Sequence, residues 1–278
     1  MLICPMGLVD AFANTPFCGN PAGVCLLKEF PDDAVLQQIA FEFNWSETAF
    51  VVALGKNLFH IRWFSPLDEA PMCGHATLAA AHFLLENNYV IGSSVEFQSL
   101  AGKLMVTTQK KEDGQSWIVM DFPAISLNKC DSPEEIELIK SVFDESEYKV
   151  DINSVFKDSI IYVVVLSNEE ELQHCRPNFE KLKNLPCRAI SVTAPSTNGC
   201  DFVSRYFAPK VGIPEDPVCG SSHCRLAPFW AKILGKDTLV AKQLSHRGGV
   251  LHLSFSPYTN RVSIAGKAVT ILTGELAI

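Results

Sequence analysis

The chain has 278 residues, 47% of them hydrophobic and 19% charged, which is typical of a soluble globular protein large enough for two domains. Its net charge of −8 at pH 7 and its isoelectric point near 5.4 argue against a nucleic-acid partner, because binding a phosphate backbone requires clustered positive charge. No apolar run approaches the roughly 20 residues that span a membrane, and nothing near Met1 resembles an export signal, so we expect a cytoplasmic protein without a membrane partner.

The ten cysteines and seven histidines are spread along the chain without any Cys-x-x-Cys pair. In a long chain without an export signal, such cysteines are expected to be free thiols, most of them buried. Metal sites usually need ligands at short, regular spacing, which this pattern lacks. We therefore expect neither disulfides nor a bound metal.

The first segment that suggests chemistry contains Glu47, which follows the apolar-patterned stretch Val35–Trp45 and precedes a strand-like run. Residues at such helix-to-strand junctions carry function more often than residues inside elements. If Phe43, Trp45 and Phe50 enclose this carboxylate, desolvation raises its affinity for a proton, which suits a general acid or base near neutral pH. Viewed in isolation, a glutamate such as Glu47 is more often a solvated surface residue or a helix cap.

Further along, aromatic and β-branched residues predict a strand over Phe59–Phe64, stopped by Pro66. The segment His75–Leu85 is apolar almost all round and ends at Asn87, a plausible C-cap, so we predict a buried central helix. Alternating strands follow and end with Trp117–Phe122.

The same elements recur in the second part of the chain. Phe202–Phe207 predicts a strand, and Ser221–Leu234 predicts a helix that ends at Gly235 and is kinked or delayed by Pro228. The segment Ser245–Leu251 places glycine ahead of an alternating strand, and a further, shorter strand over Arg261–Ile264 completes the series.

A shared motif links the two parts. It runs Arg62-Trp-Phe-Ser-Pro66 and then Glu69-Ala-Pro-Met-Cys-Gly74 in the first part, and Arg205-Tyr-Phe-Ala-Pro209 and then Glu215-Asp-Pro-Val-Cys-Gly220 in the second. Two copies in the same order indicate an internal duplication. We predict two halves, residues 1–127 and 128–278, and an α/β (α+β) fold in which each half is a sheet around one apolar helix. Arg62 and Arg205 are expected to tie loops together.

The two predicted helices begin at the repeated Cys-Gly turns, and in a duplicated fold their N-termini would face each other across a cleft. Free backbone N–H groups and the helix dipole make such ends suitable for an anion, and glycine allows close approach. We therefore place Gly74, His75, Gly220 and Ser221 around a substrate carboxylate. Ordinary helix capping is the alternative explanation for each turn taken alone.

Motifs spread over nearly the whole chain resemble those of one known family. They are Asp10-Ala-Phe12, Phe17-Cys-Gly-Asn-Pro-Ala-Gly-Val24, Ser46-Glu-Thr-Ala-Phe50, Arg62-Trp-Phe-Ser-Pro66, Cys73-Gly-His-Ala-Thr77, Asp201-Phe-Val-Ser-Arg-Tyr-Phe207, Glu215-Asp-Pro-Val-Cys-Gly-Ser221 and Ser245-His-Arg-Gly-Gly249. In this order they resemble the PhzF family of phenazine biosynthesis. The resemblance implies a diaminopimelate-epimerase-like fold, with two pseudo-symmetric domains, each a curled, mostly antiparallel sheet around a central helix, and an active site between them.

The family's acid/base glutamate corresponds to Glu47, and its supporting polar residues correspond to His75, Asp216 and Ser221. Its substrate-binding positions correspond to Ser46, Cys73, Gly74, Cys219 and Gly220. The phenazine enzyme isomerises a dihydro-hydroxyanthranilate by moving a proton between ring carbons, with no metal or organic cofactor. The resemblance thus implies a cofactor-independent isomerase that acts on a small cyclic or amino carboxylate, and a homodimer.

Two other functions remain open. The chain has cysteine in both copies of the motif, whereas the phenazine enzyme has threonine at the position of Cys219, so Cys73 and Cys219 could form the base and acid of a two-cysteine racemase. Thiols at helix N-termini have depressed pKa values, which supports that alternative, although both cysteines could simply pack in the core. A catalytically silent small-molecule-binding protein is the third possibility, since fold does not imply activity. The roles of His223 and His246 stay undecided.

Overall fold

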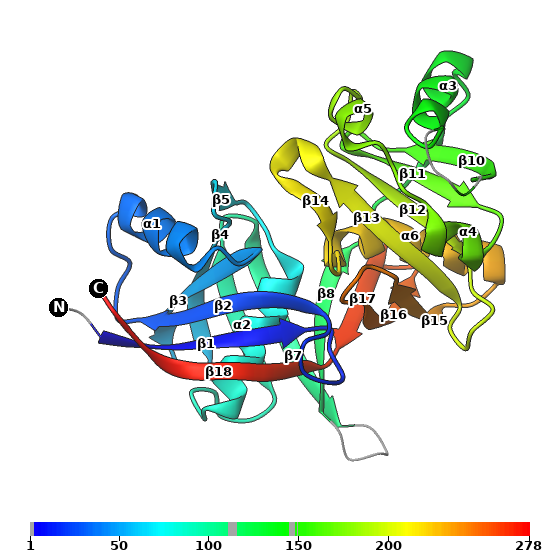
Figure 1. Ribbon diagram of the computed structural model, residues 1–278. Coiled ribbons are helices and arrows are strands. Elements are labelled where there is room, and N and C mark those ends of the chain that lie inside the picture. The colour runs from blue at the N-terminus through cyan, green and yellow to red at the C-terminus, as the bar shows by residue number, and fades with distance from the viewer. Residues whose placement is uncertain (1–2, 111–115, 145–147, 149) are drawn as a thin grey trace. The chain divides into compact units, whose positions relative to one another are not determined.

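The computed structural model describes residues 3–110, 116–144, 148 and 150–278 (Figure 1). The chain forms two compact units, one of Met1–Phe122 with Ser263–Ile278 and one of Pro123–Val262. The second unit begins close to the expected boundary at residue 127. The last 16 residues depart from the predicted division into two halves, because they belong to the first unit. There the final strand of the chain pairs with the first strand.

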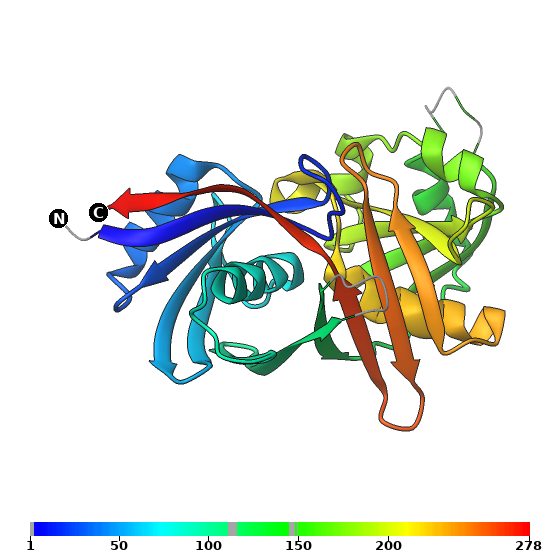
Figure 2. The same ribbon diagram turned by 90° about the horizontal axis from the view of Figure 1, so that it is seen from below.

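The first unit is built on one twisted sheet. Its elements are β1 (Ile3–Ala11), β2 (Asn20–Leu27), α1 (Asp33–Phe43), β3 (Glu47–Gly55), β4 (Leu58–Phe64), β5 (Glu69–Ala70), α2 (Gly74–Glu86), β6 (Ser94–Ser99), β7 (Gly102–Lys110), β8 (Ser116–Pro123) and β18 (Ala268–Ala277). The strand order is β18-β1-β2-β3-β4-β6-β7-β8, and only the β2/β3 and β4/β6 pairs are parallel. Figure 2 shows α2 inside the curve of this sheet.

The second unit repeats this plan. Its elements are β9 (Asn128–Lys129), α3 (Pro133–Ser141), β10 (Ile152–Lys157), β11 (Ile161–Leu166), α4 (Glu169–His174), α5 (Phe179–Lys183), β12 (Ala189–Pro195), β13 (Phe202–Ala208), the 3-10 turn η1 (Pro209–Val211), β14 (Ile213–Asp216), α6 (Gly220–Leu234), β15 (Thr238–Gln243), β16 (Gly249–Ser256) and the first two residues of the boundary strand β17 (Arg261–Gly266). The strand order is β9-β10-β11-β12-β13-β15-β16, and the β11/β12 and β13/β15 pairs are parallel.

The topology of the two units is the same, which supports the internal duplication. In each unit, a strand connects through helical structure to a parallel neighbour. An antiparallel strand, a short strand and the central helix follow in the chain. The strand after the central helix then pairs in parallel with that antiparallel strand. The predicted α/β fold class, with mostly antiparallel sheets and one central helix each, is confirmed.

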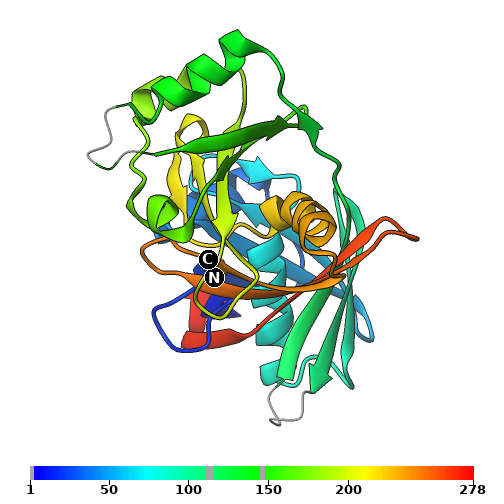
Figure 3. The same cartoon turned by 90° about the vertical axis from the view of Figure 1, so that its right-hand side faces the viewer.

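The two central helices are both largely buried, but they differ in composition. Helix α2 is apolar on nearly every face, and ten of its residues are buried. Helix α6 contains Pro228 but continues without interruption from Gly220 to Leu234, and Figure 3 shows it against β15 and β16. Proline has no N–H, so it leaves the carbonyl of Cys224 without its helical donor, and the N–H of Ile125 donates to that carbonyl at 2.9 Å instead.

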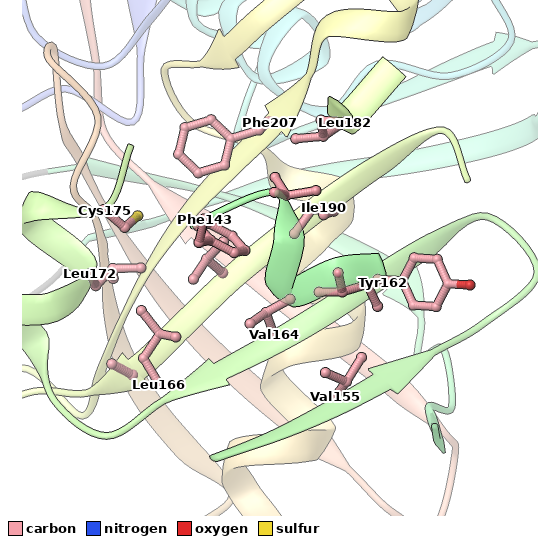
Figure 4. Close-up of a cluster of buried hydrophobic side chains, with 14 of the residues drawn as sticks. Phe143, Val155, Tyr162, Val164, Leu166, Leu172, Cys175, Leu182, Ile190 and Phe207 are labelled. Carbon is pink, nitrogen blue, oxygen red and sulfur yellow. The ribbon is translucent and has the colours of Figure 1, made fainter. Parts of the chain in front are cut away.

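A second hydrophobic layer covers the other face of each sheet. In the first unit, Leu36 and Ala40 of α1 pack with Cys25, Phe50 and Phe64 of the strands. The second unit has a larger cluster beneath α3, α4 and α5 (Figure 4), with Phe143, Tyr162, Val164, Leu166, Leu172, Leu182, Ile190 and Phe207 among its members. These clusters hold the sheets rigid, so that each short loop before a central helix has a fixed position.

All ten cysteines are free, and most are buried, as expected. Within the described ranges, no helix is both long and apolar enough to cross a membrane.

Candidate active site

In the first unit, the start of β3 and the start of α2 together form a polar cluster. This first half-site consists of Ser46, Glu47, Cys73, Gly74 and His75. The hydroxyl of Ser46 lies 3.3 Å from Nε2 of His75, and Nδ1 of the same ring lies 3.4 Å from the sulfur of Cys73. Residues from two motifs, 29 positions apart for Ser46 and His75, are thereby brought into contact.

The hydroxyl of Ser46 is anchored to strand β2. It donates to the carbonyl oxygen of Pro21 at 2.8 Å, and the side-chain oxygen of Asn20 lies 3.0 Å away. Asn20 is fully buried and begins β2, so the Gly-Asn-Pro motif serves here to position the serine. Asn20 was not among the expected site residues, although the motif that contains it, Phe17–Val24, was recognised in the sequence.

His75 is a neutral hydrogen-bonding group. Its side chain is only 7% exposed, and burial lowers the pKa of the ring to about 3, because desolvation disfavours the charged form. At physiological pH it cannot hold a substrate carboxylate by opposite charge. Any role that it has in binding depends on hydrogen bonds.

Glu47 is the first residue of β3 and is 9% exposed, so it is not a solvated surface residue. The expected enclosure by three aromatic rings is wrong. Side chains alternate along a strand, so Glu47 lies on the face opposite Phe50. Phe43, Trp45 and Phe50 belong instead to the cluster beneath α1.

The second half-site lies at the start of α6 and consists of Asp216, Cys219, Gly220 and Ser221. The sulfur of Cys219 lies 3.3 Å from the hydroxyl of Ser221. Here Ser221 occupies the position that His75 has in the first copy of the motif, two residues after the cysteine. The two half-sites therefore share a backbone plan but offer different polar groups.

A glutamine that the sequence analysis missed holds this turn together. Gln243, at the end of β15 and 1% exposed, accepts from the N–H of Cys219 at 2.9 Å and donates to the carbonyl of Asp216 at 2.6 Å. Two residues later, Ser245 donates to the carbonyl of Pro217 at 2.7 Å. The signal in the sequence that could have identified Gln243 is its place just before the Ser-His-Arg-Gly-Gly motif.

The thiol of Cys219 has the opposite character to the one expected for a helix N-terminus. Burial raises its pKa far above the ordinary value, and the negative charge of the nearby Asp216 raises it further. These two effects outweigh the hydrogen bonds from the Ser221 hydroxyl and the backbone of Ser222, which lower the pKa. The thiol is therefore protonated at neutral pH.

The remaining motif residues have structural roles. Arg62 binds both carboxylate oxygens of Glu69 at 2.7 and 2.6 Å, and Arg205 binds both oxygens of Glu215 at 2.7 and 2.9 Å. The two arginines were expected to tie loops together, but each binds a glutamate of the short strand that follows its own strand. His223 is buried and bonds to the carbonyl of Cys219.

Two pockets of the second unit are not lined by Asp216, Cys219, Gly220 or Ser221. His246 is exposed and lines one of about 440 Å³ together with Arg176 and Arg205. A more apolar cavity of about 800 Å³ is lined by α6, β10 and β11, and none of the expected site residues lines it. Among the described residues, no group of three or more His, Cys, Asp or Glu side chains is placed to hold a metal ion.

Known proteins resemble the chain over its whole length. A family model described as phenazine biosynthesis-like protein matches residues 9–274. An uncharacterized isomerase of Pseudomonas aeruginosa is 44% identical over 97% of each chain, and the human phenazine biosynthesis-like domain-containing protein is 38% identical over 98% of each. The crystal structure of a PhzF family protein from Enterococcus faecalis covers 100% of both chains with a TM-score of 0.88 and 40% identity.

A more distant structure shares the fold alone. A hydroxyproline epimerase from Agrobacterium vitis matches with a TM-score of 0.62 at 11% identity, covering 99% of this chain and 93% of its own. Sequence relatives at 38% to 44% identity are named isomerases, which assigns the enzyme class. This chain belongs to the phenazine biosynthesis-like (PhzF) family and is an isomerase.

Proposed function

We propose that the chain catalyses a cofactor-independent isomerisation of a small cyclic or amino carboxylate, with Glu47 as the general acid and base. The carboxylate of Glu47 takes a proton from one carbon of the substrate. The electron pair of the broken C–H bond shifts into the adjacent unsaturated system, and the same proton is returned to a different carbon. The atoms balance without an oxidant or a leaving group.

The observation that carries this proposal is the burial of Glu47 next to the contact between Ser46 and His75. A carboxylate with little solvent around it has few competing proton acceptors, which suits proton return to the same substrate. The first turn of α2 begins at the neighbouring Gly74, so its N–H groups are suited to bind the substrate's carboxylate.

The second half-site complements this in our proposal. Asp216 and Ser221 supply polar groups to the substrate, and Gly220 opens the first turn of α6 to a second polar group of the ligand. The family resemblance supports these roles for the residues of the second half-site. A homodimer is proposed on the same ground.

A two-cysteine racemase is disfavoured by the state of Cys219. Such an enzyme needs one thiolate as the base and one thiol as the acid. Burial and the charge of Asp216 hold the Cys219 thiol protonated, and Cys73 contacts a ring whose lowered pKa makes it a poor base. We therefore propose the carboxylate of Glu47, and not a cysteine thiol, as the base.

Hydrogen exchange in heavy water tests the proposal. The protein is incubated with cyclic and α-amino carboxylates, and proton NMR locates the deuterium. We expect exchange at a ring or allylic carbon that is lost in Glu47→Gln and kept in Glu42→Gln, a matched change at an exposed carboxylate of α1. Exchange at an α-carbon that survives Glu47→Gln and disappears in Cys73→Ser or Cys219→Ser would instead establish the racemase.

A further inference from the structure

The hydrogen-bond partners of Ser46 determine where its single hydroxyl hydrogen goes. The carbonyl oxygen of Pro21 lies 2.8 Å away and can only accept, and the side-chain oxygen of Asn20 at 3.0 Å is a second acceptor. Nε2 of His75 is more distant, at 3.3 Å. The hydrogen therefore points to strand β2, and toward the ring the Ser46 oxygen is an acceptor.

An acceptor at Ser46 requires a donor at His75. Nε2 of the ring must then carry the hydrogen. A neutral imidazole has one N–H only, so Nδ1 is left as an acceptor. The atom that faces Nδ1 is the sulfur of Cys73, at 3.4 Å, and a thiol can supply the hydrogen.

We infer that Ser46 is a positioning residue that holds the neutral His75 ring in the tautomer with hydrogen on Nε2, so that Nδ1 accepts the thiol hydrogen of Cys73. The ring is buried and stays neutral across the physiological range, because its pKa is lowered to about 3. The single N–H, and with it the direction of the whole chain of hydrogen bonds, is therefore constant with pH.

This assignment changes two of the roles expected from the family resemblance. The Ser46 hydroxyl donates its hydrogen to the carbonyl of Pro21 in β2 and accepts from Nε2 of His75. Ser46 therefore supports the site and does not itself bind the substrate. Cys73 remains a thiol and serves the first half-site as a donor to His75. The inference goes beyond the function proposed above, because the tautomer does not depend on which reaction is catalysed.

Nitrogen NMR of histidine-labelled protein tests the inference directly. The two ring nitrogens of His75, assigned by their loss in His75→Gln, should give a protonated-type Nε2 signal and a strongly downfield, unprotonated-type Nδ1 signal. Both should stay in place from pH 8 to pH 5. A protonated Nδ1 in the wild-type protein overturns the inference, whatever the variants show.

Variants then show which neighbour sets the tautomer. In Ser46→Ala, the Nδ1 signal should move toward the average of the two tautomers, and Ser46→Thr, which keeps a hydroxyl, should restore it. Cys73→Ala should leave the hydrogen on Nε2. Ser191→Ala, which removes a buried hydroxyl that contacts Ser222 in the second unit, is the matched control and should move neither signal.

The outcomes separate this inference from the proposed function. If Ser46→Ala folds and leaves both His75 signals unmoved, Ser46 does not set the tautomer and the inference fails. If Glu47→Gln keeps full activity while the tautomer is as stated, the proposed function fails and the inference stands.

Discussion

Nδ1 of His223 in α6 lies 2.8 Å from the carbonyl oxygen of Cys219, the N-cap residue of this helix, four positions earlier in the chain. A carbonyl only accepts, so this ring carries its hydrogen on Nδ1, and Nε2 accepts from the hydroxyl of Ser204 at 3.4 Å. In the first unit, the hydroxyl of Thr77 binds the carbonyl of Cys73 from the same helical position, at 2.6 Å. An imidazole in one unit thus replaces a hydroxyl in the other, and it introduces a group that can titrate.

The buried histidines predict a loss of stability in mild acid. Burial lowers the pKa of His75 to about 3 and that of His223 to about 4, from an ordinary value of 6.5. Below pH 6.5 the unfolded chain therefore binds more protons than the folded one, so the stability that each ring contributes is complete above pH 6.5 and falls as the pH decreases toward the folded value, by up to about 1.4 kcal/mol per pH unit.

The His223→Gln variant isolates this contribution. Between pH 7 and pH 5 the free energy of unfolding should fall by about 2 kcal/mol less in the variant than in the wild type, because the proton-binding difference of His223 is gone. Urea unfolding at the two pH values measures it. Parallel losses in both proteins would mean that His223 is not the group responsible.

The protonated state of Cys219 predicts low reactivity toward alkylating agents. Only a thiolate reacts rapidly, and both burial and the charge of Asp216 oppose its formation. At pH 8 iodoacetamide should label Cys18, which is only partly buried, at least about tenfold faster than Cys219 in the native protein, as followed by peptide mass spectrometry.

The unfolded protein is the control for that experiment, because labelling of Cys18 and Cys219 should then become similar. Asp216→Asn removes the nearby negative charge and should increase the native rate at Cys219. Labelling of Cys219 as fast as that of Cys18 in the native protein would contradict the assignment and favour the two-cysteine racemase.

The repeated arginine–glutamate pairs should differ in their contribution to stability. The Arg205 side chain is 8% exposed, and Glu215 is the only carboxylate of the described residues that binds it, whereas Arg62 also binds Asp33 at 2.7 Å. Removing the charge with Glu215→Gln leaves a buried guanidinium uncompensated and should lower the free energy of unfolding by about 3 kcal/mol.

The matched change Glu69→Gln should cost clearly less, because Asp33 still faces Arg62. Chemical denaturation of the two variants at neutral pH gives the comparison. Equal losses would show that the second carboxylate of Arg62 does not compensate.

Much of the fold was predictable because both copies of the repeat contain the same short sequence motifs. The strand of aromatic residues, the Pro that stops it and the Cys-Gly turn before an apolar helix occur in both units, and each element forms where the pattern places it. The return of β18 to β1 was not predictable. These strands lie at opposite ends of the chain, and an alternating strand pattern does not specify its neighbour.

The site was predictable by residue type more than by geometry. The motifs identified Glu47 and His75, but the face of Glu47 depends on strand register, where a shift of one residue exchanges the two sides of the sheet. The contact between Ser46 and His75 requires β2, β3 and α2 to be assembled first. Gln243 was missed because it acts through two backbone groups, and backbone partners leave no pattern in the sequence.

Close packing at Gly23 of β2 offers a test of how Ser46 is held in place. A Cβ atom at this position would lie 2.5 Å from Cε3 of Trp45, which also packs on Phe43 with ring centres 4.6 Å apart. The indole packs against the cluster beneath α1, so displacing it disturbs that cluster. Because Ser46 directly follows Trp45, displacing the indole should also shift the serine hydroxyl.

Gly23→Ala should therefore lower the free energy of unfolding by about 1–3 kcal/mol and move the Nδ1 signal of His75. Gly55→Ala, at the far end of β3, places its methyl group where no atom lies within 4 Å and should change stability by less than about 0.5 kcal/mol. Denaturant unfolding and nitrogen NMR of both variants decide the matter. If Gly23→Ala destabilises the protein but leaves His75 unmoved, the position of Ser46 is fixed by its bonds to Asn20 and Pro21 and not by the packing of Trp45.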